Sequence, residues 1–329
     1  MEFRKIIKIN QADFRIGYNN HTLSLGSCFA DHMGQKLMEA KFSVLSNPFG
    51  VLYNPLSVLN SLNLLKNGRF MQEEDLVMYN KMYHSFFFHS VFSDENVIQA
   101  LQKMNGLIAE GRDMLNKSDR LIITFGTAWV YEWKESGDVV SNCHKIPASK
   151  FERRRLSVTE IVEAWIPFLE EYFQNNPGRY VVFTVSPIRH WKDGAFENQC
   201  SKSTLILAID ELCRKYNAVT YFPAYEIFMD ELRDYRFYAE DMIHPSQQGI
   251  AYVWERFSET YFSKDTLEDI KEWDKLRKML SHRSLSGMSE SYKNFLRENL
   301  KRIEQFRQKR PYFDLNLELQ QLKELCNTL

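Results

Sequence analysis

A serine near one end of the chain and an aspartate–histidine pair near the other have the types and the order needed for nucleophilic catalysis. Ser27 follows a short apolar run that ends in Gly26, and Asp241 and His244 stand three residues apart before Pro245. A nucleophilic serine needs a base that takes its proton and a carboxylate that orients that base. Asp241 and His244 can fill these two roles, so the three residues predict a Ser-His-Asp triad.

The stretch around Ser27 predicts a strand, a tight turn and a helix. From Met33 onward, apolar residues recur at helical spacing as far as Phe42. A serine at the carboxyl end of a strand in an open α/β sheet faces the ligand crevice, beside the positive end of the following helix. The alternative is that Ser27 only caps this helix through a backbone N–H.

The loop around Asp241 and His244 precedes an amphipathic segment at 250–262. Pro245 stiffens the turn, so both side chains can project from one loop toward one point. The alternative is an exposed loop pair without a catalytic role.

Four short motifs resemble those of a known family. The pentapeptide Gly-Ser-Cys-Phe-Ala at 26–30 resembles the signature of the GSCFA family, a branch of the SGNH/GDSL hydrolase superfamily, and Asp241-x-x-His244-Pro245 resembles the last block of that superfamily. The similarity covers about residues 20–260 and includes Asn-Cys-His-Lys at 142–145 and Ser-Pro-Ile-Arg-His at 186–190. The resemblance implies an acyl esterase or acyltransferase acting on an O-acylated carbohydrate or a related small or polymeric substrate. Ser27 would be the nucleophile, His244 the base and then the acid, and Asp241 the residue that orients His244.

The resemblance also implies an oxyanion hole, of which one part departs from the superfamily pattern. The N–H groups of Ser27 and Gly50 are the expected donors, although Gly50 could equally serve only a turn. The third sequence block of the superfamily is Gly-x-Asn-Asp at the end of a strand, and this chain has Ala128 in the position of its asparagine. Each preorganised donor stabilises a transition state by about 2.7–4 kcal/mol. We therefore expect Thr127 or Asn142 to replace the missing asparagine, unless Asn142 belongs to a polar turn that closes a hairpin.

Three further polar residues are candidates for binding substrate. Arg189 and His190 follow the predicted strand at 179–185, at the edge of the sheet where ligands bind. His144, beside Asn142, offers a second donor. The segment 151–173 opens with a basic cluster at 153–155 and continues as a predicted helix with Ser157 or Thr159 as its cap. We expect the three arginines on a solvated face, unless they meet a substrate carboxylate or phosphate.

Alternating strands and helices predict the fold class. Buried strands are expected at 120–127 and 179–185, and an amphipathic helix at 97–115. This alternation favours a three-layer α/β/α domain with a mainly parallel sheet, and the family resemblance implies an SGNH-like, flavodoxin-like form of it. We expect this domain at 1–262 and a C-terminal helical appendage at 263–329, where charged residues and helically spaced apolar residues predominate.

The amino-acid composition limits which partners and which cellular compartment we expect for the protein. The 329 residues include 42 basic and 43 acidic side chains, so no net field indicates nucleic acid or an anionic membrane. The five cysteines form no C-x-x-C pair, and His84 and His89 have no partners that would complete a metal shell. We expect neither metal nor cofactor, no membrane span, a cytoplasmic location, and C-terminal helices that pack on the body or form a homodimer contact.

Two rival functions stay open at this stage. Cys28 could be the nucleophile instead of Ser27, since a helix N-terminus lowers the pKa of a thiol. Alternatively, the altered third block marks a catalytically reduced carbohydrate-binding or scaffold protein on the same fold. A nucleotide enzyme is disfavoured, because neither Gly-x-x-x-x-Gly-Lys nor Gly-x-Gly-x-x-Gly occurs.

Overall fold

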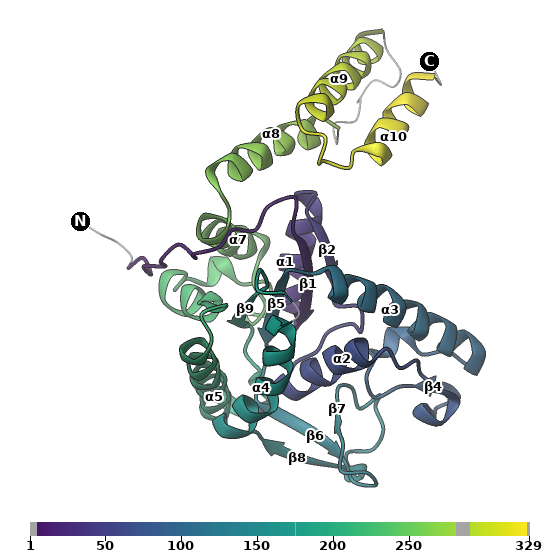
Figure 1. Ribbon diagram of the computed structural model, residues 1–329, viewed down its shortest axis with the longest axis vertical. Coiled ribbons are helices and arrows are strands. Elements are labelled where there is room, and N and C mark those ends of the chain that lie inside the picture. Colours follow the sequence, from purple (N-terminus) through teal and green to yellow (C-terminus); the bar gives the residue numbers. More distant parts are fainter. Residues whose placement is uncertain (1–4, 175, 281–289, 328–329) are drawn as a thin grey trace.

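A five-stranded parallel sheet forms the centre of the protein, as the computed structural model of residues 5–174, 176–280 and 290–327 shows (Figure 1). Every neighbouring pair in this sheet is parallel, in the order β2-β1-β5-β9-β10. The strands are β1 (His21–Gly26), β2 (Ser43–Ser46), β5 (Arg120–Phe125), β9 (Tyr180–Val185) and β10 (Val219–Phe222). This is the flavodoxin-like order, which confirms the predicted fold class.

The order of the strands locates the ligand crevice. The chain leaves β1 toward β2 on one side and later returns to β5 on the other side, so the topological switch point lies between β1 and β5. Ligands of open α/β sheets bind outside the carboxyl ends of the strands at such a point. Ser27 directly follows β1, and Gly126 directly follows β5.

Helices cover both faces of the sheet and create the three layers. One core joins alternate residues of β1, β5 and β9, such as Leu23, Leu121 and Phe183, to four helices. A second core joins the opposite faces, at Ile122 and Val182, to two long helices, the turns at 224–232, the N-terminal segment and Ile270 of the C-terminal region. The first face carries α2 (Pro55–Asn67), α3 (Val97–Lys117), α4 (Val158–Gln174) and α5 (Gly194–Lys215), and the second carries α1 (Cys28–Glu39) and α7 (Gln247–Tyr261).

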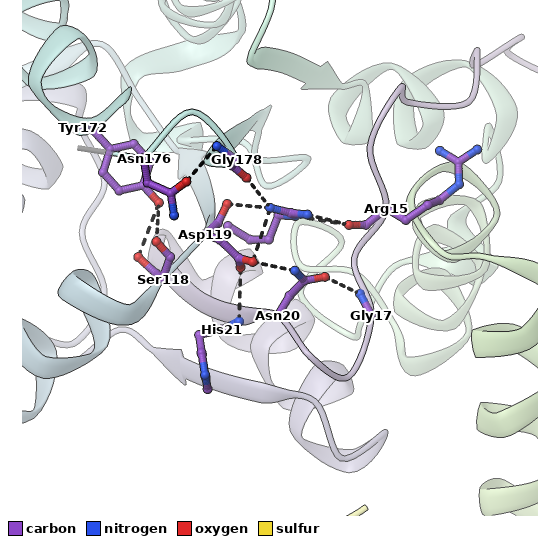
Figure 2. A network of polar contacts seen from close by, with 10 residues as sticks. Arg15, Gly17, Asn20, His21, Ser118, Asp119, Tyr172, Asn176 and Gly178 are labelled. Carbon is purple, nitrogen blue, oxygen red and sulfur yellow. Dashed lines mark hydrogen bonds and ion pairs between the residues drawn. The ribbon is translucent and has the colours of Figure 1, made fainter. Parts of the chain in front are cut away.

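A polar network at the amino ends of the strands joins three segments that are far apart in the sequence (Figure 2). The Asp119 carboxylate accepts the Asn20 side-chain amide at 2.6 Å and the His21 N–H at 3.2 Å. The Arg120 guanidinium donates to the carbonyls of Arg15 and Gly178. These bonds fasten the strand starts at the end of the sheet remote from Ser27.

A separate antiparallel sheet in the order β7-β6-β8 lies beside the carboxyl ends of the central strands. It comprises β6 (Trp129–Trp133), β7 (Val139–Val140) and β8 (Phe151–Arg155). The helix predicted after the basic cluster begins at Val158, and the Ser157 hydroxyl accepts the Glu160 N–H at 3.2 Å, as expected of its cap. The basic cluster itself belongs to β8, which pairs with β6 and was not predicted. Arg154 and Arg155 of β8 pair with glutamates at the surface.

Short elements complete the body. A small antiparallel hairpin consists of β3 (Val77–Tyr79) and β4 (Met82–His84). The single turns are η1 (Glu73–Asp75), η2 (Ser90–Phe92), η3 (Ala148–Lys150), η4 (Trp191–Asp193), α6 (Ala224–Glu226), η5 (Ile227–Glu231) and η6 (Tyr235–Phe237).

The C-terminal helices of the described chain lie at the opposite end of the long axis from the β7-β6-β8 sheet (Figure 1). They are α8 (Lys264–Leu280), α9 (Glu290–Lys309) and α10 (Asn316–Asn327), and they enclose an apolar core around Trp273 and Phe306. Contacts with the body include the Trp273 indole N–H, which donates to the Glu39 carbonyl at 2.8 Å, and an ion pair between Lys41 and Glu318 at 2.5 Å. The domain boundary near residue 263 and the homodimer contact stay predictions.

Candidate active site

Ser27 stands in a turn that only glycine can precede. Gly26 has φ +146°, and a Cβ at this position would collide with the Thr124 carbonyl of the adjacent strand. Ser27 is 2% exposed and is the N-cap of α1, where its Oγ accepts the Phe29 N–H at 3.3 Å. The capping role is therefore real, and it leaves the hydroxyl proton of Ser27 available to a base.

Asp241 and His244 form a dyad on a well-anchored loop. The Asp241 Oδ2 lies 2.5 Å from Nδ1 of His244, and its Oδ1 accepts the backbone N–H groups of Ile243 and His244, each at 2.9 Å. These three hydrogen bonds lower the pKa of Asp241 to about 2, led by the bond from the His244 N–H. Because Nδ1 faces the carboxylate, Nε2 is the nitrogen left to act as a base.

A cavity of about 540 Å³ brings the two halves of the predicted triad together. Ser27 and His244 both line it, and Asp241 lies directly behind His244. No hydrogen bond joins Ser27 Oγ to His244 within the described residues. Cys28 also lines the cavity, with its Sγ 3.5 Å from the Tyr53 hydroxyl.

The predicted backbone donors of the oxyanion hole already have acceptors. The N–H of Ser27 donates to the Thr124 carbonyl at 3.2 Å, and the N–H of Thr127 donates to the Tyr53 carbonyl at 2.9 Å. The hydroxyl of Thr127 contacts Ser201 at 3.0 Å. The N–H of Gly50 donates to the Asn47 carbonyl at 2.8 Å, and Gly50 does not line the cavity, which supports its interpretation as a turn residue.

Asn142 lines the cavity, whereas His144 does not. The Asn142 Oδ1 accepts the His144 N–H at 2.9 Å, which fixes the side chain and leaves its amide N–H groups as donors. His144 is buried between the hydroxyl of Ser90, 2.9 Å from Nδ1, and the carbonyl of Ser85, 2.7 Å from Nε2. Burial lowers its pKa to about 4. The expected role of His144 in binding substrate therefore has no support in this arrangement.

His190 lies close to the nucleophile, on the other side of Gly126. A methyl group on Gly126 would lie 3.3 Å from Nε2 of His190 and 3.4 Å from Cβ of Ser27. The imidazole also meets the Tyr53 ring edge to face, with 5.5 Å between the centroids. Burial, reinforced by the charge of Lys202, lowers the pKa of His190 to about 3. His190 is therefore neutral at physiological pH, and its ring N–H can donate.

Lys202 lies next to the site, and the sequence did not identify it as a candidate residue. It is fully buried, and its ammonium donates to the carbonyls of Gly126 and Ser186, both at 2.7 Å. Burial lowers its pKa to about 7. Because these carbonyls follow β5 and β9, Lys202 ties together the two loops that carry Gly126 and His190.

Aromatic and cationic side chains form the rest of the wall. Arg153 of β8 stacks on Trp129 with its guanidinium carbon 4.1 Å from the ring centroid, and it pairs with Asp193 at 2.5 Å. One of the three basic-cluster arginines therefore lines the cavity. The other aromatic and cationic lining residues are Tyr53, Tyr131, Trp191, Arg189 and Lys192.

Two family models match the chain. The one described as the GSCFA family matches residues 21–257, and the one described as the C-terminal domain of GSCFA domain proteins matches residues 273–328. No curated protein and no solved structure is found to match.

Two general properties of the described chain complete this comparison. Residues 5–174, 176–280 and 290–327 contain no group of three or more His, Cys, Asp or Glu side chains suited to a metal ion. None of the helices that the structure describes is long and apolar enough to cross a membrane. The cytoplasmic location stays a prediction.

Proposed function

The chain belongs to the GSCFA family, and we propose that it is an SGNH-type serine hydrolase that cleaves acyl esters of a carbohydrate through an acyl-enzyme on Ser27. The observation that carries the proposal is the cavity shared by Ser27 and His244, with Asp241 bonded to the far side of the imidazole. A nucleophile, a base and a group that orients the base are the parts that acyl transfer requires.

The reaction would proceed in two halves. Ser27 Oγ attacks the acyl carbon while Nε2 of His244 takes the hydroxyl proton, and the same nitrogen then returns the proton to the departing alcohol oxygen. A water molecule next attacks the acyl-enzyme while Nε2 of His244 takes its proton, and His244 then gives this proton to Ser27 Oγ as the bond to the acyl carbon breaks, which releases the carboxylic acid and restores the free serine. Asp241 stays ionised throughout, because its hydrogen bonds hold its pKa at about 2.

Three groups at the cavity are suited to bind the oxyanion. The N–H of Cys28 belongs to the first turn of α1, where backbone N–H groups lack acceptors within the helix. The side-chain amide of Asn142 and the neutral imidazole of His190 are the other two. In this proposal His190 and Asn142 together take over the role of the superfamily asparagine, in whose position this chain has Ala128.

A carbohydrate substrate is supported by the aromatic lining. Tyr53, Trp129, Tyr131 and Trp191 surround a space large enough for a sugar ring with its acyl group. Flat aromatic rings pack against the C–H faces of sugars and supply apolar contact area at low entropic cost. Both hydrolysis and transfer to a sugar hydroxyl are compatible with this site.

The test is direct detection of the acyl-enzyme. Wild-type protein incubated with 4-nitrophenyl acetate and quenched in acid should carry one acetyl group on the peptide that contains Ser27. The His244→Ala variant should accumulate far less of it, because the serine is not deprotonated. Acetylation of Cys28 instead, or of neither residue in folded protein, would contradict the proposal.

The alternative function is a carbohydrate-binding or scaffold protein without turnover. The observation in its favour is that the N–H groups of Ser27, Gly50 and Thr127 are all engaged with backbone carbonyls. This alternative expects a sugar ligand to bind equally well to wild type and to the His244→Ala variant, with no acyl-enzyme in either protein.

A further inference from the structure

Arg189 lies at the junction of two cavities. The cavity that contains Ser27 and a second cavity of about 420 Å³ share Arg189, Trp191 and Ile243 in their walls. Together they form a groove that continues beyond the catalytic centre. A substrate of more than one sugar unit can therefore lie across Arg189.

The charge of Arg189 has no acidic partner among the described residues. Its Nη2 lies 3.2 Å from the sulfur of Met229, and its guanidinium carbon is 5.7 Å from the Trp191 ring centroid. Its Nε is buried and has no hydrogen-bond partner in the part of the chain that the structure describes. A partly buried cation in apolar surroundings is costly unless an anion meets it. A bound anionic group would remove that cost.

The lining carboxylates of the two cavities already have partners other than Arg189 among the described residues: Asp193 pairs with Arg153, Asp234 with Arg236, and Asp241 with the imidazole of His244. Lys192 donates to the Tyr131 hydroxyl at 3.2 Å and adds a second positive charge without a carboxylate. The acid–base pairs of the other cations are Arg153 with Asp193, Arg233 with Asp230, and Arg236 with Asp234. Asp241 is hydrogen-bonded to His244, which is uncharged when it acts as a base, so Asp241 keeps one negative charge. Arg189 and Lys192 together outweigh that charge, so the groove carries an excess of positive charge.

The catalytic geometry decides which part of the substrate meets Arg189. His244 returns its proton to the departing alcohol, so the alcohol must lie on the His244 side of the acyl carbon. Asp241, Met242 and Ile243, from the loop that carries His244, line the second cavity. The alcohol, which is the sugar, therefore extends toward Arg189 and the second cavity, while the acyl group stays beside Ser27.

We propose that the substrate is an acidic saccharide ester whose carboxylate or phosphate binds Arg189. This inference rests on the proposed hydrolase function. Trp191 and Tyr235 line the second cavity and are 50% and 72% exposed, so their rings are free to stack on the sugar next to the acidic group. Arg189 would bind the anion through its planar fork of N–H donors.

Matched substrates test this proposal. Methyl glucuronoside and methyl glucoside, acetylated on the same ring hydroxyls, differ only at C6, where a carboxylate replaces a hydroxymethyl group. Methyl glucoside 6-phosphate with the same acetyl groups tests a phosphate at that position. Wild type should hydrolyse at least one acidic ester with a kcat/KM about 10-fold or more above that of the neutral ester, mainly through a lower KM. In Arg189→Gln this ratio should fall to about one, and Arg189→Lys should retain an intermediate preference.

Controls separate this inference from the hydrolase proposal. Arg155→Gln removes the same charge from a strand beside the cavity, and it should keep the wild-type ratio. Calorimetry with unacetylated methyl glucuronoside on Ser27→Ala measures binding without turnover. If the sugar acid binds in a way that depends on Arg189 but no ester is hydrolysed, the hydrolase proposal is wrong and the anion-binding role of Arg189 stands.

Two results would overturn the inference. One is equal kcat/KM for the acidic and neutral sugars in wild type that labels normally with a serine-directed probe. The other is an Arg189 dependence seen only when 4-nitrophenyl hemisuccinate is compared with 4-nitrophenyl butyrate, because the anion would then belong to the acyl group.

Discussion

Asp241 holds both the ring and the backbone of His244: one carboxylate oxygen lies 2.5 Å from Nδ1, and the other accepts the His244 N–H at 2.9 Å. Asp241→Asn keeps the shape of this contact but removes the acceptor that fixes the tautomer. We expect kcat for an acetyl ester to fall by about 10³–10⁴, with little change in KM. Steady-state kinetics measures this loss. Asp230→Asn, an exposed acid remote from the imidazole, should behave as wild type, and a loss below 10-fold in Asp241→Asn would remove Asp241 from the triad.

The close packing around Gly126 predicts that a larger residue at this position disturbs the active site. A methyl group there would lie 3.1 Å from the Tyr53 carbonyl, 3.3 Å from His190 Nε2 and 3.4 Å from Ser27 Cβ. Gly126→Ala should therefore displace His190 and lower kcat/KM by about 10-fold or more. Gly106→Ala is the matched control, because a Cβ on this α3 residue meets nothing within 4 Å. It should raise the free energy of unfolding by about 0.8–1.0 kcal/mol at full activity. Full activity in Gly126→Ala would contradict the placement of His190.

The buried contacts of Lys202 predict that its replacement lowers the free energy of unfolding. Lys202→Met removes the donor to the carbonyls of Gly126 and Ser186, and each buried carbonyl left unpaired costs about 1–3 kcal/mol. We expect a loss of about 2–5 kcal/mol in the free energy of unfolding, measured by urea denaturation. Lys215→Met, an exposed position on the same helix, should change it by less than about 0.5 kcal/mol. Equal stabilities of the two variants would show that Lys202 does not hold the loops.

His144 predicts a pH dependence of stability rather than of catalysis. Burial lowers its pKa in the folded state to about 4, from an ordinary value of 6.5 that the unfolded chain retains. Between these pH values the unfolded chain binds more protons, so the free energy of unfolding falls as the pH drops from 6.5 to 4. At about 1.4 kcal/mol for each pKa unit, His144 can account for up to about 3 kcal/mol of this fall. Urea denaturation across this range should show a shallower fall in His144→Gln, and parallel curves would contradict the assignment.

The sequence predicted the elements whose patterns are local. The apolar run into Gly26, the helical spacing after it and the buried strands at β5 and β9 all appear as expected, and with them the parallel sheet. The Asp241–His244 contact also follows from residues three apart in one loop. These predictions depend only on neighbouring residues.

Features that depend on distant contacts could not be predicted. β8 has little apolar alternation, because its arginines pair with Glu132, Glu160 and Glu197 on other elements. A lysine in an amphipathic helix is expected to be exposed, and only the carbonyls of Gly126 and Ser186, which follow the paired strands β5 and β9, provide acceptors for a buried Lys202. Histidine is a common catalytic residue, but the side chain of His144 is buried against Ser85 and Ser90 and does not line the cavity.

Serine activation is the central claim, and labelling with a fluorophosphonate probe tests it most directly, since the probe reacts with activated serines whatever their natural substrate. We expect wild type and Cys28→Ala to be labelled, and Ser27→Ala and His244→Ala, shown to be folded by circular dichroism, to be unlabelled. Labelling that persists in Ser27→Ala, or that is absent from folded wild type, would contradict the assignment of Ser27 as a nucleophile activated by His244.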